Sequence, residues 1–98
     1  MGYGYSKRSV DNNHSKIRDD LRKVLGKNAV IDTHALPKFV DLVVGYKGNN
    51  YLFEVKTDKK KKLTKDEQKI KDTWQGQYDV ITTAEEAIKI MMCDNPPF

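Results

Sequence analysis

Apolar side chains recur every three or four residues between Asp11 and Leu25, which is the spacing of one face of an α-helix. The positions that form this stripe are Ile17, Leu21, Val24 and Leu25. Gly26 follows directly, and a glycine in this place commonly ends a helix. The pattern therefore predicts a one-sided amphipathic helix over residues 11–25.

Three short runs of apolar and β-branched residues come next. "AVID" at 29–32 is a short strand candidate, and "KFVDLVVGY" at 38–46 is a stronger one, limited on its N-terminal side by Pro37. "YLFEVKT" at 51–57 is separated from it by "GNN" at 48–50, which has the composition of a turn. The second and third runs are therefore predicted to form an antiparallel hairpin.

Two capping-box sequences, "TKDE" and "TAEE", predict where two further helices begin. In the first, the Thr64 hydroxyl can accept from the Glu67 amide while the Glu67 side chain reaches back. The elements predicted in this part are a helix over 64–75, a strand over 78–83 and a helix from 83 to Met92. The order α-β-β-β-α-β-α predicts an α/β fold with a mixed β-sheet and flanking helices.

The bulk composition narrows the function classes. A chain of 98 residues forms one domain at most, which we place at 11–98 after a flexible basic segment at 1–10. The formal net charge of +4 favours a polyanionic partner. Cys93 is the single cysteine, so neither an intrachain disulfide nor a cysteine metal site can form, and no apolar run approaches the roughly 20 residues of a membrane helix. We expect a soluble, cytoplasmic protein without a membrane partner.

Asp41 interrupts an otherwise apolar run, and Glu54 lies inside the neighbouring predicted strand. A buried, unpaired carboxylate costs several kcal/mol, and facing residues of an antiparallel pair lie about 5 Å apart, so two such anions would repel each other. A divalent cation resolves this repulsion, and carboxylate oxygens suit Mg²⁺ or Mn²⁺. The backbone carbonyl of Val55 is a natural third oxygen ligand.

Lys56 lies two residues after Glu54 and so shares its face of the strand. A metal and an ammonium together would stabilise the transition state of phosphodiester hydrolysis. Taken alone, a D…ExK pattern recurs often by chance, and its commoner explanation is an exposed hairpin with local pairing of the lysine. The elements predicted around the pattern favour the catalytic explanation over the exposed hairpin.

Asp41, twelve intervening residues and "EVK" at 54–56 resemble the PD-(D/E)XK nuclease superfamily, and most closely its small stand-alone VRR-Nuc family. The likeness continues through "LTKDEQ", "GQYDVI" and "TAEEA", and it covers roughly residues 11–92. The order of elements carries more weight in it than any one residue.

The resemblance implies a restriction-endonuclease-like core and Mg²⁺- or Mn²⁺-dependent cleavage of DNA. For stand-alone members of this size it also implies a homodimer that acts on branched DNA such as Holliday junctions, in a bacterium or a virus-infected cell. The roles implied are metal ligation by Asp41, Glu54 and the carbonyl of Val55, a catalytic ammonium on Lys56, and support from Gln68 on the following helix.

The chain departs from the family pattern in two places. Val40 precedes Asp41 where the family usually has proline, which does no chemistry. His14 stands where the family often has a glutamate on the first helix. An imidazole can bind Mn²⁺ but is a poor Mg²⁺ ligand, so His14 is a weaker candidate ligand whose alternative is a solvated residue of the first helical turn. Asp11 is another source of the missing carboxylate.

A dense run of lysines follows Lys56. The lysines predicted to contact DNA phosphates are Lys59, Lys60, Lys61, Lys62 and Lys65. The alternative is a solvated loop that keeps a sheet edge from aggregating. Trp74 and Tyr78 are expected to be core and strand residues rather than platforms for base stacking, and His34 has no role that the sequence indicates.

The sequence thus favours a metal-dependent endonuclease that hydrolyses DNA phosphodiesters. Two alternatives remain open at this point. A non-catalytic nucleic-acid-binding module on the same fold would bind DNA without cutting it. An assembly or regulatory protein would use the lysines for solubility alone.

Overall fold

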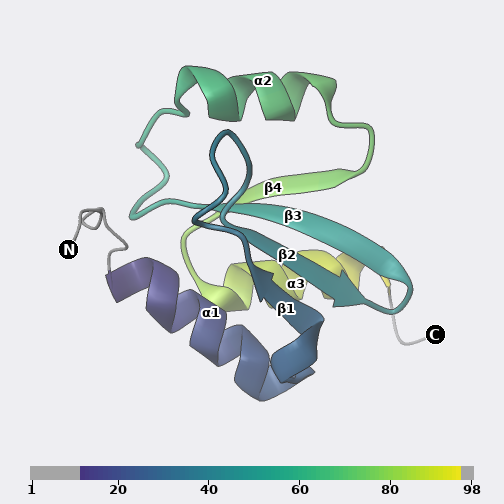
Figure 1. Cartoon of the computed structure of the whole chain (residues 1–98). Helices are drawn as coiled ribbons and strands as arrows, with labels where there is room; N and C mark the ends of the chain where they lie inside the picture. Colours follow the sequence, from purple (N-terminus) through teal and green to yellow (C-terminus); the bar gives the residue numbers. More distant parts are fainter. Residues whose placement is uncertain (1–11, 96–98) are drawn as a thin grey trace.

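Helices cover both faces of one four-stranded sheet in the computed structural model, which describes residues 12–95 (Figure 1). The elements are α1 (Asn12–Leu25), the short 3-10 helix η2 (Lys27–Ala29), β1 (Val30–Asp32), β2 (Leu42–Tyr46), β3 (Asn49–Val55), α2 (Lys65–Thr73), β4 (Gln77–Ile81) and α3 (Ala84–Asp94). This confirms the predicted order and the mixed α/β class. The predicted segment 1–10 and the alternative ligand Asp11 lie outside the described residues.

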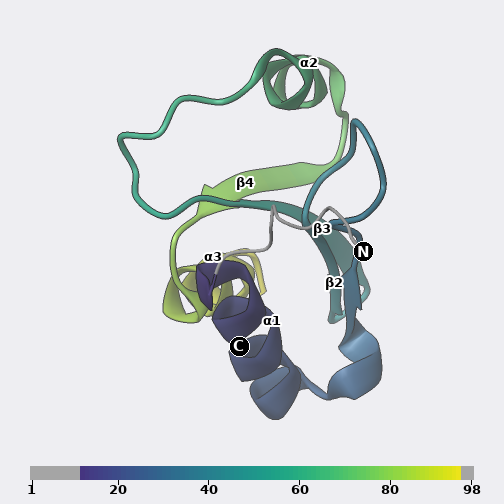
Figure 2. The same cartoon turned by 60° about the vertical axis from the view of Figure 1, so that its left-hand side comes forward.

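The sheet has the strand order β1-β2-β3-β4 and is mixed. Its first two pairings are antiparallel, whereas β3 and β4 run parallel. Helices α1 and α3 lie on one face and α2 lies on the other, as two views of the molecule show (Figures 1 and 2). The chain crosses from β3 to β4 through α2, which lies on the face opposite to α1.

The hydrophobic core lies between the sheet and the pair α1 and α3. Its fully or almost fully buried members are Ile17, Leu21, Val30, Leu42, Val44, Tyr51, Phe53, Ile81, Ala84, Ala87 and Met91. Tyr51 and Phe53 alternate along β3 with Leu52 and Glu54, which therefore point to the face that carries α2. Helix α2 itself buries none of its side chains, and Trp74 at its end is 45% exposed, so the expectation that Trp74 is a core residue was wrong.

The strand ends differ from the predicted ones for local reasons. The hairpin turns at Lys47 and Gly48, whose φ angles of 50° and 83° match the left-handed pair that a two-residue hairpin requires. Asn49 and Asn50 are therefore paired strand residues rather than turn residues. β2 begins only at Leu42, because the preceding residues form a loop in which the Thr33 hydroxyl donates to the carbonyl of Val40.

The two predicted helix caps are formed. Thr64 and Glu67 make both halves of a capping box, with hydrogen bonds of 3.2 and 2.8 Å. At the start of α3 the Thr83 hydroxyl accepts from the Glu86 amide at 3.1 Å, but the Glu86 carboxylate accepts from Thr82 instead of completing the box. No helix within residues 12–95 is long and apolar enough to cross a bilayer.

Candidate metal-binding catalytic site

Asp41 is fixed at the start of the hairpin by bonds to both neighbouring segments. Its amide donates to the carbonyl of Phe53, and its carbonyl accepts from the amide of Thr33. Its carboxylate accepts from the amide of Val55 at 2.8 Å through Oδ2. Leu42 pairs with Phe53, and extending this antiparallel register by one residue sets Asp41 opposite Glu54, as the sequence predicted.

Glu54 is a buried carboxyl group with an unsatisfied atom. The residue is only 1% exposed, and its Oε1 has no hydrogen-bond partner among the described residues. Burial raises the pKa of Glu54 to about 9, with further contributions from the neighbouring carboxylates of Asp41 and Glu67. Lys56 is close enough to oppose this rise but does not cancel it. Such a group requires either a proton or a cation.

This environment predicts an unusual pH dependence for the metal-free protein. The folded-state pKa of Glu54 lies above the ordinary value of 4.5, so the folded state binds this proton more tightly than the unfolded state does. The associated stability is fully present below about pH 4.5 and is lost progressively as the pH rises toward 9. In EDTA we expect the free energy of unfolding to fall by roughly 2–4 kcal/mol between pH 5 and 8.

Urea unfolding at several pH values measures this loss. Glu54→Gln should flatten the curve over the same range, while the exposed control Glu85→Gln should keep the wild-type slope. A wild-type stability that stays level from pH 5 to 8 would contradict a buried, protonated Glu54.

Lys56 extends to the same face and meets a residue of α2. Its ammonium donates to Glu67 Oε1 at 2.6 Å, and the side chains of Lys56 and Glu67 are 13% and 18% exposed. Its backbone is held on both sides, because its amide donates to the carbonyl of Ile81 and its carbonyl accepts from Asn13 at 2.9 Å. The lysine predicted to be catalytic is thus held close to Glu54 by its bond to Glu67.

Helix α2 contributes Glu67 to this group and not the predicted Gln68. Gln68 is exposed, and its amide donates to Asp72 on its own helix at 2.8 Å. The same Glu67 oxygen that receives Lys56 also caps α2 through the Thr64 amide. These two donors lower the pKa of Glu67 in spite of its burial, so it is a stable anion facing the ammonium.

The predicted DNA-binding lysines lie on the loop after β3 and at the start of α2. Lys60, Lys61, Lys62 and Lys65 are exposed. Lys59 differs from them because its ammonium pairs with Glu86 on α3 at 2.6 Å, although its side chain is still 64% exposed. Most of the block is therefore accessible to a polyanion.

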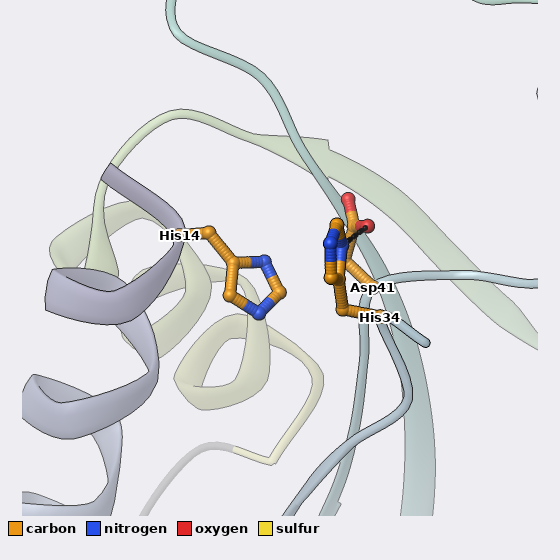
Figure 3. A group of neighbouring side chains, drawn as sticks. All are labelled: His14, His34 and Asp41. Atoms are coloured by element: carbon orange, nitrogen blue, oxygen red, sulfur yellow. Dashed lines mark hydrogen bonds and ion pairs between the residues drawn. The ribbon is translucent and has the colours of Figure 1, made fainter. Parts of the chain in front are cut away.

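Two histidines lie near the Asp41 carboxylate. His14 is only 3% exposed, and its Nε2 lies 3.2 Å from an oxygen of Asp32, so the alternative of a solvated His14 was wrong. His34, for which the sequence indicated no role, has its Nδ1 3.4 Å from Asp41 Oδ1. Figure 3 shows the ring of His14 pointing from its helix toward the other two side chains.

Tyr78 borders the carboxylate pair from β4. It pairs with Leu52 across the parallel ladder, and its buried hydroxyl has no hydrogen-bond partner among the described residues. Burial, followed by the charges of Glu54, Glu67 and Asp41, raises its pKa, which keeps it a neutral phenol. Two unsatisfied polar atoms, Glu54 Oε1 and Tyr78 Oη, therefore occur in one acidic environment.

This donor set suits a hard divalent cation. Asp41 and Glu54 offer carboxylate oxygens, and an ion between them would satisfy the orphaned oxygen and offset both the burial of Glu54 and its repulsion by Asp41. Val55 is the last residue of β3, and the role of its carbonyl stays a prediction.

Comparison with protein-family models, with curated proteins and with solved structures found no match to this chain.

Proposed function

We propose that the protein is a metal-dependent endonuclease that hydrolyses DNA phosphodiesters on a restriction-endonuclease-like core. The observation that carries this proposal is the buried Glu54 carboxyl with its unsatisfied oxygen, opposite Asp41 and beside the Lys56 ammonium. The order of the elements around these residues supports the proposal, because the hairpin of β2 and β3 and the helix α2 that follows it bring Asp41, Glu54 and Lys56 to one face of the sheet.

The residues of the chain have distinct parts in this reaction. Mg²⁺ or Mn²⁺, when bound, supplies positive charge to a phosphate oxygen and lowers the pKa of a water molecule. Asp41 and Glu54 would hold the ion, and the Val55 amide orients the Asp41 carboxylate. Lys56 would place its ammonium against the charge that develops on the phosphate, and Glu67 holds that ammonium in position.

The exposed lysines of the loop after β3 would contact the DNA backbone. Lys60, Lys61 and Lys62 follow the strand that carries Glu54 and Lys56, so the basic surface begins where the proposed active site ends. Phosphate contacts of this kind position a substrate without reading its sequence. This favours recognition of DNA shape, such as a four-way junction, and a homodimer would place two active sites on a substrate with two-fold symmetry.

A cleavage panel tests the proposal. Purified protein is incubated with linear duplex and with four-way-junction DNA in Mg²⁺, Mn²⁺ or EDTA, and its mass is measured by sedimentation. We expect metal-dependent products, faster on the junction, from a dimer. Salt-sensitive binding without products in either metal would favour the non-catalytic nucleic-acid-binding module, and neither binding nor products would contradict both.

A further inference from the structure

We propose that His14, His34 and Asp41 form a second metal subsite, which binds a first-row transition metal such as Co²⁺ or Mn²⁺ in preference to Mg²⁺. One nitrogen from each histidine and one oxygen of Asp41 all lie within 4.8 Å of one another. Three ligands each about 2.1 Å from one ion in a tetrahedral arrangement lie about 3.4 Å from one another, so the widest of these separations has to close by up to about 1.4 Å when an ion binds. Figure 3 shows the three side chains converging.

The three ligands come from separate segments of the chain. His14 is on the first turn of α1, His34 is in the loop after β1, and Asp41 directly precedes β2. The two imidazole rings lie 4.8 Å apart between centroids and are tilted by 53°, so they are not stacked face to face. Rings that converge at an angle on one carboxylate are arranged as ligands of one ion.

Asp32 supports both histidines as an outer carboxylate. Its oxygens lie 3.2 and 3.3 Å from Nε2 of His14, and one of them accepts from the backbone amide of His34 at 3.0 Å. Arg18 donates to the same carboxylate at 3.0 Å.

This arrangement matches the outer shell of metal-binding histidines in general. A carboxylate that accepts from one imidazole nitrogen fixes the tautomer and orientation of the ring and makes the other nitrogen more basic. A single carboxylate, Asp32, does this for His14 and also positions the backbone of His34. An ion pair between His34 and Asp41 alone would not require the buried His14–Asp32 pair beside it.

The ligand types determine which metals fit. Two imidazoles and one carboxylate suit Mn²⁺, Co²⁺ and Zn²⁺, whereas Mg²⁺ prefers oxygen ligands. Asp41 belongs to both sites, and one carboxylate can bridge two ions about 3.5–4 Å apart. The metal subsite itself follows from this geometry alone, but its effect on DNA cleavage rests on the proposed nuclease function.

The visible spectrum of bound Co²⁺ tests the subsite without any activity, because nitrogen ligation changes the absorption of the ion. Wild-type protein is titrated with Co²⁺ alongside His34→Gln, His14→Gln and Glu54→Gln. We expect a nitrogen-ligated Co²⁺ spectrum in wild type and in Glu54→Gln, with Co²⁺ affinity at least tenfold weaker in His34→Gln. The control is Ala35→Gln, which places the same side chain at the next exposed loop position and should bind like wild type.

The buried His14 carries a risk of misfolding on substitution, and the half-exposed His34 therefore decides the outcome. Wild-type Co²⁺ affinity in a folded His34→Gln protein would overturn the subsite, as would the absence of a nitrogen-ligated spectrum in wild type. In cleavage, His34→Gln should lower the ratio of Mn²⁺- to Mg²⁺-supported rates about tenfold. Histidine-dependent Co²⁺ binding without DNA cleavage would refute the nuclease function and support the metal subsite. DNA cleavage together with Co²⁺ binding that does not depend on the histidines would refute the subsite and support the nuclease function.

Discussion

Asp41→Asn is expected to lower the rate of Mg²⁺-dependent DNA cleavage by about a thousandfold, at the upper end of what removal of one charge-stabilising group costs an active site. The substitution removes the negative charge that the proposed ion needs. It keeps an oxygen that can accept from the Val55 amide, so the start of β2 should stay in place. Single-turnover cleavage of a four-way junction measures the effect.

The metal-free stability of this variant provides a second readout. Loss of the Asp41 charge removes part of the repulsion that raises the pKa of Glu54, so the stability of Asp41→Asn should depend less on pH than that of wild type. Asp20→Asn is the matched control, because Asp20 pairs with Lys16 of the same helix, α1. Products that persist unchanged in Asp41→Asn would show that the cleavage comes from another protein.

Lys56→Met should lower the cleavage rate by about 10²- to 10³-fold while leaving the affinity for Mn²⁺ within about threefold of wild type. Methionine keeps the length and apolar stem of the lysine but removes the ammonium that faces Glu67. The expected loss is therefore confined to stabilisation of charge on the phosphate. Single-turnover rates at saturating Mn²⁺ and calorimetric Mn²⁺ titrations separate the two effects.

Two further variants define the role of that ammonium. Glu67→Gln should reduce the rate by a smaller factor, about tenfold, because Lys56 keeps its charge but loses the ionic contact that holds it. Lys16→Met is the control, since its ammonium pairs with Asp20 of the same helix, α1. A Lys56→Met protein that cleaves as fast as wild type would remove Lys56 from the chemistry.

Most elements of the fold could be predicted from local signals in the sequence. The apolar stripe predicted α1, the two threonine caps predicted the starts of α2 and α3, and two runs of apolar and β-branched residues on either side of a turn sequence predicted the hairpin. The hairpin itself was predicted, but the register that sets Asp41 opposite Glu54 follows from the turn at Lys47 and Gly48, which lies earlier than the predicted turn at 48–50. These parts of the site were predictable because their contacts are close in the sequence.

The parts that the sequence did not predict depend on contacts between distant segments. His14 is buried because Asp32, 18 residues later, receives its ring, and nothing near His14 indicates that partner. His34 approaches Asp41 through the conformation of the loop between Thr33 and Val40, which a side-chain-to-backbone hydrogen bond defines. Loops of this kind have no periodic pattern that would reveal their course.

Glu67 is the residue for which a signal was present. It was recognised as the third residue of a capping box, and a carboxylate at the N-terminus of a helix that follows a catalytic strand is positioned to receive a lysine from that strand. Gln68 was preferred because the resemblance assigned the role to a glutamine. The capping geometry turns the Glu67 side chain back toward β3, whereas Gln68 extends along the helix to Asp72.

The central claim is that Asp41 and Glu54 together hold one divalent cation. Glu54 is protonated in the metal-free protein at pH 7, since its pKa is about 9, and it must lose that proton to bind an ion. Calorimetric Mg²⁺ titrations in two buffers of different ionisation enthalpy count the protons released. The account predicts about one proton per Mg²⁺ in wild type and none in Glu54→Gln. The absence of Mg²⁺ binding, or equal proton release by both proteins, would contradict it.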